Sequence, residues 1–270
     1  MSRSYLFIPG NTPSMIQNLD VFESDAVIID FEDSVTSYDK DAARILIKNF
    51  LKKYSYKEID LYIRINSAES GYFLNDVKDT LDLDIIGYVL PKASVKAIKA
   101  LNELSSKQII PIIESPLALL DVKEIAREDN VTALLLGAED YTKELGIKRS
   151  LEGKEIFYAR SIVAITANAY NIDSIDTPYT NKEDMAGLLV DSKSALNLGF
   201  TSKSSIHPNQ VDIINKVFAP SIEEITEAKR IVKKSEETNK GAFSLDGKMI
   251  DLPIIEKAKK VLEKAKKYNL

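Results

Sequence analysis

The sequence of 270 residues contains no cysteine and only one histidine, His207. Disulfide bonds, thiolate metal sites and cysteine nucleophiles are therefore excluded. A metal site built from several histidines of one chain is also excluded, and a histidine-centred catalytic triad would have to use His207. Any metal site in this chain must rely mainly on oxygen ligands.

Long apolar runs and clustered positive charge are missing as well. No apolar run reaches the roughly 18 residues of a membrane span, and the run at residues 5–9 is too short for a signal peptide. The 36 basic and 41 acidic residues are interspersed and give a net charge of −5, without the basic stripe that a nucleic-acid backbone demands. We expect a cytoplasmic protein with no membrane or nucleic-acid partner.

Short apolar runs that end in polar or turn-forming residues recur eight times along the chain. They cover residues 5–9, 26–30, 61–65, 87–91, 108–114, 133–137, 174–177 and 201–206. Between them lie helical patterns, such as residues 41–51. Several runs are apolar almost throughout, as a parallel strand covered on both faces requires. The repeat predicts an α/β fold of the TIM (β/α)₈ barrel type.

A doubly wound open sheet is the alternative architecture. It would usually show a glycine-rich phosphate turn after the first strand, and residues 9–13, Pro-Gly-Asn-Thr-Pro, do not form one. We assign residues 1–220 to the barrel and residues 221–270 to a C-terminal helical extension. The extension reads as a helix at 220–234, a polar segment at 241–251 and an amphipathic helix at 253–267 opened by proline. It could cap its own barrel or reach a neighbouring subunit.

Polar residues gather where the apolar runs end. Loops after the strands of such a barrel converge on one face, so these residues should form one charged ring. They are Asp30, Glu32, Asp33, Arg64, Asn66, Lys92, Glu114, Glu139 and Asp140.

A ring with this many carboxylates predicts a divalent cation. Burying several like charges at one mouth costs several kcal/mol unless cations compensate, and Arg64 with Lys92 compensate only in part. Mg²⁺ suits hard oxygen ligands and takes one or two carboxylates together with water and substrate oxygens. For a single carboxylate such as Asp140 or Asp33, the alternative is a helix N-cap.

Two further residues have open interpretations. Lys92 could form a Schiff base with a carbonyl substrate, but that needs an apolar pocket, whereas neighbouring carboxylates would keep the lysine protonated. His207 ends the eighth run and either packs against its surroundings or contacts the substrate.

Taken together, the motifs at the strand ends resemble the citrate lyase β-subunit group of the aldolase and citrate lyase superfamily, which includes malyl- and citramalyl-CoA lyases. The resemblance runs almost end to end. It rests on residues 3–11, 29–35, 40–44, 63–66, 90–92, 113–115, 136–141, 159–161, 199–200 and 206–210.

The resemblance implies roles for most residues of the ring and for two residues beside it. Glu114 and Asp140 would bind Mg²⁺, and Glu114 would also face the substrate. Arg64 would grip a carboxylate or carbonyl of the substrate, with Lys92 nearby. Gly137 and Ala138 would border the thioester oxygen. The carboxylates that would hold metal-bound waters are Asp30, Glu32 and Asp33.

The implied reaction is a retro-Claisen cleavage of a 3-hydroxy-acyl thioester. A base takes the proton of the substrate hydroxyl, a keto acid departs, and the remaining thioester briefly carries an enolate. In relatives that act on CoA thioesters, an aspartate from a neighbouring subunit serves as acid or base, and residues 246–251 match that segment. Asp251 would then act in trans in an oligomer, a homotrimer by resemblance. Alternatively, Asp251 only caps the helix that begins near Pro253.

We expect the citryl lyase step of a citrate lyase complex, in which a citryl thioester on an acyl carrier protein gives oxaloacetate and an acetyl thioester. Citrate lyase α and γ subunits would then be partners. The alternative within the same chemistry is a free-standing citramalyl- or malyl-CoA lyase that releases pyruvate or a related keto acid. It is favoured by residues 206–208 and by the departure at 116–117. A non-catalytic scaffold subunit is the alternative of another class.

Overall fold

The structure is a computed structural model that describes residues 2–238 and 241–270. Eight parallel strands close into a barrel in chain order, with β1 hydrogen-bonded to both β2 and β8. The strands are β1 (Ser4–Pro9), β2 (Ala26–Asp30), β3 (Asp60–Arg64), β4 (Gly87–Leu90), β5 (Gln108–Ile113), β6 (Ala133–Leu136), β7 (Asp173–Asp176) and β8 (Ser202–Ser205). The predicted (β/α)₈ barrel is confirmed, and the open-sheet alternative is wrong.

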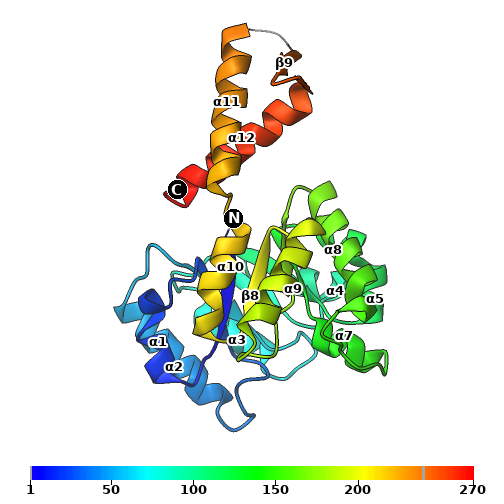
Figure 1. Cartoon of the computed structure of the whole chain (residues 1–270). Coiled ribbons are helices and arrows are strands. Elements are labelled where there is room, and N and C mark those ends of the chain that lie inside the picture. Colours follow the sequence, from blue (N-terminus) through cyan, green and yellow to red (C-terminus); the bar gives the residue numbers. More distant parts are fainter. Residues whose placement is uncertain (1, 239–240) are drawn as a thin grey trace. The chain divides into compact units, whose positions relative to one another are not determined.

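Helices connect successive strands and surround the barrel (Figure 1). They are α1 (Pro13–Ile16), α2 (Lys40–Lys53), α3 (Phe73–Thr80), α4 (Val95–Asn102), α5 (Pro116–Leu120), α6 (Val122–Ala126), α7 (Ala138–Glu144), α8 (Phe157–Ala169), α9 (Met185–Asn197) and α10 (Val211–Phe218). Short 3₁₀ turns cover Leu19–Phe22, Lys154–Ile156 and Pro208–Gln210. Ser94 and Ser115 cap α4 and α5 with their side chains, so both helices begin soon after their strands end.

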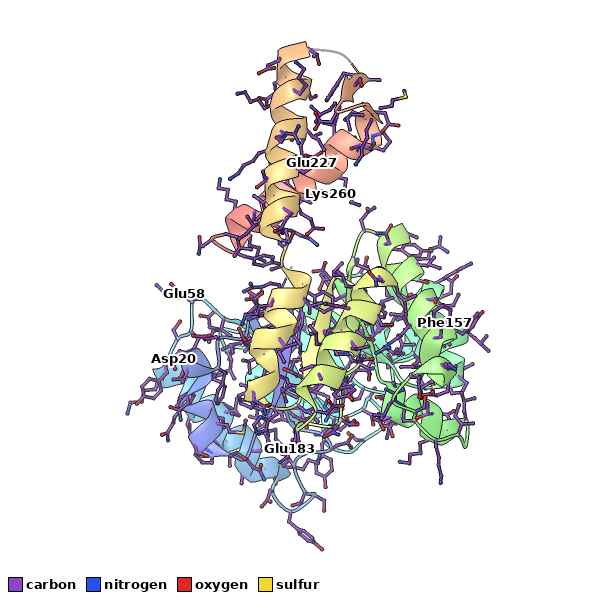
Figure 2. The ribbon with its side chains drawn as sticks, in the orientation of Figure 1. Asp20, Glu58, Phe157, Glu183, Glu227 and Lys260 are labelled. Carbon is purple, nitrogen blue, oxygen red and sulfur yellow. The ribbon has the colours of Figure 1, made fainter. Side chains whose placement is uncertain are left out.

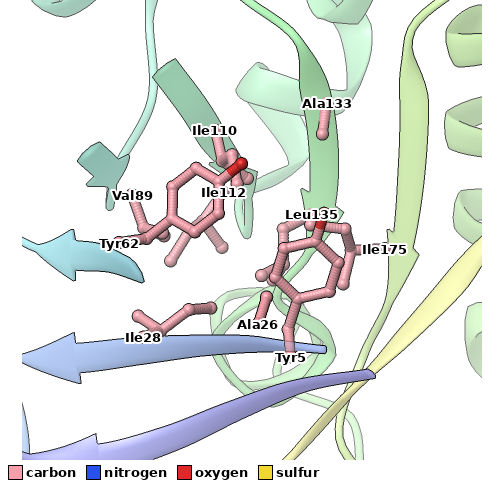
Figure 3. Packing of buried hydrophobic residues seen from close by; sticks show 10 residues of the cluster. All are labelled: Tyr5, Ala26, Ile28, Tyr62, Val89, Ile110, Ile112, Ala133, Leu135 and Ile175. Atoms are coloured by element: carbon pink, nitrogen blue, oxygen red, sulfur yellow. The ribbon is translucent and has the colours of Figure 1, made fainter. Parts of the chain in front are cut away.

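The barrel interior is filled by side chains from alternate strand positions (Figure 3). This buried cluster consists of Tyr5, Ala26, Ile28, Tyr62, Val89, Ile110, Ile112, Ala133, Leu135 and Ile175. Charged side chains such as Asp20, Glu58 and Glu183 lie instead on the outer surface (Figure 2). Because successive side chains of a strand alternate between faces, the interior positions predict which later residues point inward.

Continuing this alternation toward the carboxyl ends of the strands leads directly to polar residues. Ile28 is followed two residues later by Asp30, Tyr62 by Arg64, and Ile112 by Glu114. In the same way Ile175 leads to Thr177. The pleat that builds the apolar core therefore also places these polar side chains over its carboxyl-terminal end.

A second compact unit begins at Lys216 and contains its own small core. It is formed by α11 (Ile222–Thr238), β9 (Phe243–Leu245), β10 (Lys248–Ile250) and α12 (Leu252–Lys267). Asp246 and Gly247 connect the two strands with positive φ angles of 51° and 77°, which a two-residue hairpin turn requires. This hairpin lies where the sequence predicted only a polar segment. Among the described residues, no helix is long and apolar enough to cross a bilayer.

Candidate active site

A cavity of about 440 Å³ opens at the carboxyl ends of the barrel strands. Its polar lining combines one arginine with five carboxylates and two hydroxyls, of which one is buried, and the remaining wall is largely apolar. The polar members are Asp30, Asp33, Ser34, Arg64, Glu114, Glu139, Asp140 and Thr177. Most of the predicted ring therefore surrounds one space.

Arg64 is fixed in this cavity by Asp30. Its Nε and Nη2 atoms donate to the two carboxylate oxygens of Asp30, at 2.7 Å each, and Nη1 lies 3.1 Å from Glu32 Oε2. The guanidinium also lies over the ring of Phe7, 5.2 Å from its centroid. Burial works against the charged form of Asp30, but the hydrogen bonds and charge of Arg64 outweigh it and lower the pKa of Asp30.

A buried lysine holds the loop after β2 through hydrogen bonds to its backbone. Lys40, at the start of α2, donates through Nζ to the carbonyl oxygens of Phe31 (2.7 Å) and Glu32 (2.8 Å). In addition, the amides of Glu32 and Ser34 donate to the carboxylate of Asp30. The loop that presents Glu32 and Asp33 to Arg64 thus has little freedom to move.

A second buried contact supports the same loop from α3. The fully buried carboxylate of Asp76 accepts from the amide and the side chain of Asn66 and from Arg44. Asn66 links Asp76 to the loop, because its Nδ2 also donates to the carbonyl of Phe31 at 3.0 Å. Asn66 therefore braces the loop and is not among the residues that line the cavity.

Glu114 is the most buried of the proposed metal ligands, with 7% of its surface exposed. Its Oε1 accepts the backbone N–H of Lys92 at 2.5 Å. Burial raises the pKa of Glu114 to about 7; the Lys92 amide opposes this rise, and the nearby charge of Asp140 adds to it. A cation bound between these carboxylates would relieve their repulsion.

Lys92 contributes to this arrangement through its backbone. It adopts a positive φ of 48°, and its side chain is exposed and outside the residues that line the cavity. This position does not give the apolar, desolvated environment that a Schiff-base lysine needs. The side-chain contact with substrate stays a prediction.

Asp140 and Glu139 lie in the first turn of α7, directly after β6. Asp140 is about half exposed, at 48% of its side chain, and Glu139 pairs with Arg149 at 3.0 Å. Within residues 2–238 and 241–270, no three acidic or histidine side chains form a ready-made metal cluster. Two carboxylates, Glu114 and Asp140, nevertheless suit Mg²⁺, which fills its remaining positions with water and substrate oxygens.

Burial also perturbs Glu32, although this residue is not among those lining the cavity. Its pKa rises to about 8, chiefly through burial, while Arg64 opposes the rise and Asp33 adds to it. Glu32 and Asp33 face the same guanidinium, at 3.1 and 3.8 Å.

Gly137 and Ala138 line the cavity, and both of their amides already have partners. The N–H of Gly137 donates to the carbonyl of Ile113 at 3.0 Å, and that of Ala138 donates to Thr177 Oγ1 at 3.3 Å. A Cβ at Gly137 would lie 2.6 Å from the Cβ of Glu114, so only glycine fits beside this ligand.

Two of the residues singled out by sequence serve as caps in the structure. Asp251 precedes α12 in the second unit, and its Oδ1 accepts the N–H of Ile254 at 3.4 Å. His207 precedes a 3₁₀ turn, where its Nδ1 lies 2.6 Å from Asn209 Oδ1. His207 is not among the residues that line the cavity.

Sequence reasoning missed Thr177, and it missed a buried ion network beside it. Lys203 donates to the carbonyl of Thr177 and to the carboxylates of Asp176 and Asp191 at 2.6–2.7 Å, while Arg160 binds the same two carboxylates. The alternation along β7 indicated that Thr177 points the same way as Ile175, but Thr177 belongs to no recognisable motif.

A family model and individual relatives match this chain over most of its length. Residues 3–208 match the family described as HpcH/HpaI aldolase/citrate lyase. Citrate lyase subunit beta of Haemophilus influenzae is 35% identical over 283 residues, covering 98% of this chain and 97% of the relative. Mitochondrial citramalyl-CoA lyase of Mus musculus is 29% identical over 286 residues, covering 96% and 85%.

A solved structure is similar over the same length. Protein CitE from Mycobacterium tuberculosis, in complex with magnesium, acetoacetate and coenzyme A, superposes with a TM-score of 0.83 and 27% identity, covering 98% of both chains.

Proposed function

The chain belongs to the HpcH/HpaI aldolase/citrate lyase family, and we propose that it is a Mg²⁺-dependent carbon–carbon lyase that cleaves a 3-hydroxy-acyl thioester. The observation that carries this proposal is the convergence of Glu114, Asp140 and Arg64 on one cavity. Magnesium in the similar CitE complex supports the choice of metal.

In this proposal Glu114 and Asp140 hold the ion. When bound, Mg²⁺ supplies a Lewis acid for the hydroxyl and carboxylate oxygens of the keto-acid half of the substrate. Arg64 adds a permanently charged donor for the substrate carboxylate, and Asp30 sets the plane of its guanidinium. Asp33 lines the cavity and Glu32 pairs with Arg64 beside it, and in this proposal both carboxylates accept from waters around the site.

Cleavage also requires a group that takes the hydroxyl proton and returns a proton to carbon. We assign this role to Asp251 of a neighbouring subunit, which makes an oligomer, a homotrimer by resemblance, necessary for activity. Asp251 belongs to the second unit, and residues 246–251 resemble the segment that supplies this aspartate from a neighbouring subunit in relatives that act on CoA thioesters.

The substrate we propose first is a citryl thioester, which gives oxaloacetate and an acetyl thioester. The 35% identity with a citrate lyase β subunit over nearly the whole chain supports it, and citrate lyase α and γ subunits would then be partners. A free-standing citramalyl- or malyl-CoA lyase is the second candidate, favoured by the likeness to a citramalyl-CoA lyase and to a CoA complex.

The test is Mg²⁺-dependent release of keto acid from citryl-CoA, citramalyl-CoA and malyl-CoA by the full-length protein. We expect one thioester to be preferred, and we expect Glu114→Gln and Asp140→Asn to lose turnover and the Mg²⁺-dependent rise in Tm. Glu124→Gln changes a carboxylate on the exposed surface of α6 and should retain both.

Magnesium-dependent stabilisation separates the lyase from a scaffold. A wild-type protein that cleaves no thioester, with or without an acyl carrier protein, and gains no stability from Mg²⁺ with oxaloacetate or pyruvate would be a non-catalytic subunit.

A further inference from the structure

We propose that the hydroxyl of Thr177 is the side-chain donor to the thioester oxygen of the substrate when that oxygen becomes negatively charged. This inference rests on the proposed lyase function and adds a catalytic residue to it. Thr177 directly follows β7 and is 1% exposed, and it lines the same cavity as Glu114 and Arg64.

The retro-Claisen step creates a demand for such a donor. When the substrate hydroxyl loses its proton to the base, its oxygen forms the carbonyl of the keto acid and the carbon–carbon bond breaks. The electron pair of that bond moves into the thioester half, which becomes an enolate with negative charge on oxygen. A proton delivered to the enolate carbon then gives the acetyl thioester, so no further reactant is needed. Donors aimed at this oxygen stabilise the transition state.

The backbone amides that the resemblance places beside this oxygen, those of Gly137 and Ala138, already have hydrogen-bond partners. The amide of Gly137 is part of the sheet, bonded to Ile113, and the amide of Ala138 donates to Thr177 Oγ1. An amide whose hydrogen points at a protein acceptor cannot serve the substrate oxygen without breaking that bond. The corner of the cavity that should receive the thioester oxygen therefore needs another donor.

Thr177 has the unused hydrogen in this corner. A threonine hydroxyl carries one donor hydrogen and two acceptor lone pairs. Oγ1 accepts from Ala138, and among the described residues the hydroxyl of Thr177 donates no hydrogen bond, so its own hydrogen is unpaired. Because Thr177 is buried and borders the cavity, its hydroxyl hydrogen can point into the cavity. The bond from Ala138 polarises the hydroxyl and makes it a better donor.

The position of Thr177 is set by the buried ion network outside the barrel. Lys203 donates to the carbonyl oxygen of Thr177 at 2.7 Å and is itself held by Asp176 and Asp191. This bond holds the backbone of Thr177, and the bond from Ala138 to Oγ1 holds its side chain. A donor held in place before the reaction is the arrangement that oxyanion stabilisation requires.

Thr177 could instead serve only to cap the first amide of α7. The two roles differ in what they affect, because α7 also carries Asp140. A purely structural role would change Mg²⁺ affinity and stability together with turnover. A donor to the enolate would change turnover and enolate formation while Mg²⁺ and keto acid still bind.

The experiment compares Thr177→Val, which keeps the shape but removes the hydroxyl, with Thr177→Ser, which keeps the hydroxyl. For each variant, kcat and KM for the preferred thioester are measured at saturating Mg²⁺, together with the Mg²⁺-dependent shift in Tm. Exchange of the methyl hydrogens of acetyl-CoA with D₂O, in the presence of Mg²⁺ and keto acid, reports enolate formation directly.

We expect Thr177→Val to lose about 10²-fold in kcat, the usual effect of removing one oxyanion donor, and to lose exchange in parallel. Thr177→Ser should restore most of both. The matched control is Thr142→Val, because Thr142 is a buried threonine whose hydroxyl donates to the carbonyl of Ala138 in α7 but does not line the cavity. It should leave kcat nearly unchanged.

Turnover and exchange by Thr177→Val at the wild-type rate would overturn the inference while leaving the lyase function intact. A loss shared equally by the valine and serine variants, accompanied by weaker Mg²⁺ binding, would also overturn it in favour of the structural role. If the wild-type protein cleaves no thioester, the proposed function fails and this inference fails with it.

Discussion

Asp30 binds Arg64 with both carboxylate oxygens, through Nε and Nη2 at 2.7 Å each. The same two oxygens accept the amides of Glu32 and Ser34 at 2.7 and 3.0 Å. A carboxylate offers about four lone-pair sites, so these four bonds use its acceptor capacity. Asp30 therefore fixes Arg64 and the adjacent loop, and we propose that Glu32 and Asp33 are the carboxylates with acceptor capacity for metal-bound water.

Asp30→Asn should reduce activity by misplacing Arg64. The amide keeps the size of the carboxylate, but its nitrogen meets guanidinium or backbone donors where an acceptor is needed. We expect kcat/KM for the thioester to fall by about 10- to 100-fold, as for other residues that orient a binding group. Steady-state kinetics at saturating Mg²⁺ measures this loss.

Asp25→Asn is the control for that variant. Asp25 makes the same forked pair with Arg3, at 2.7–2.8 Å, just before β1 and β2 begin and thus at the opposite end of the strands. It should alter stability without altering kcat/KM. Equal kinetic losses in both variants would mean that Asp30 matters only for folding.

Lys40→Met should loosen the loop that carries Glu32 and Asp33. Two carbonyl oxygens, of Phe31 and Glu32, would lose the ammonium that now lies 2.7–2.8 Å away. Leaving a buried acceptor without a partner costs about 1–3 kcal/mol, which urea unfolding can measure. Weaker binding of keto acid in the presence of Mg²⁺ should accompany it, as a smaller ligand-dependent Tm shift.

Lys48→Met provides the comparison, since Lys48 lies on the same helix but pairs with Asp79 at the surface. Its removal should cost little. Unchanged ligand-dependent Tm shifts in Lys40→Met would show that the loop does not depend on this lysine.

The strands could be predicted to within about one residue at most ends because the barrel buries both faces of each strand. Runs such as residues 26–29 and 133–136 have no polar interruptions, and they stop where the chain meets solvent or the cavity. The hairpin in residues 243–250 gave no such signal. Its strands have three residues each, and Met249 is 73% exposed.

The composition of the cavity was predictable, whereas the pairing within it was not. Arg64 ends an apolar strand, and Glu114 and Asp140 follow apolar strands, so the fold brings them to one mouth. Which amides are already bonded depends on the register between β5, β6 and β7. For this reason the resemblance could place Gly137 and Ala138 beside the thioester oxygen without indicating that both amides are already bonded, and Thr177 was not singled out. The orientation of the Lys92 side chain depends on the positive φ of this residue, and a lysine at this position does not indicate a positive φ as a glycine would.

Stability at acidic pH should depend on Glu155. Its carboxylate accepts from the amide and hydroxyl of Ser150 and from Arg149. Burial opposes ionisation, but these bonds outweigh it and lower the pKa of Glu155 to about 2, from about 4.5. Because the folded-state pKa lies below the unfolded one, the group stabilises the fold above about pH 4.5. That contribution is lost as the pH falls toward 2.

Glu155→Gln should therefore lower the free energy of unfolding at neutral pH and flatten its decline between pH 4.5 and 2. Urea unfolding at several pH values measures the difference between variant and wild type. Glu152→Gln, an exposed neighbour, should show the wild-type pH dependence. A variant curve that runs parallel to the wild type across this range would exclude the predicted linkage.

Asp251 can be tested separately as a cap and as an acid or base. Asn and Ser cap helices about as well as Asp, so Asp251→Asn and Asp251→Ser should keep α12 and the Tm of the protein while removing the carboxylate. Loss of turnover in both variants at unchanged Tm would support the catalytic assignment. Full turnover with an unchanged pH profile would leave Asp251 only its bond to Ile254.

Whether Asp251 acts in trans follows from mixing two inactive variants, Glu114→Gln and Asp251→Asn, under conditions that allow subunits to exchange. If each site takes its barrel from one subunit and its Asp251 from the next, random mixing leaves about a quarter of the sites with both residues intact. Turnover should then return to about that fraction. If the barrel and Asp251 of one chain work together, every site keeps one defect and mixing restores nothing.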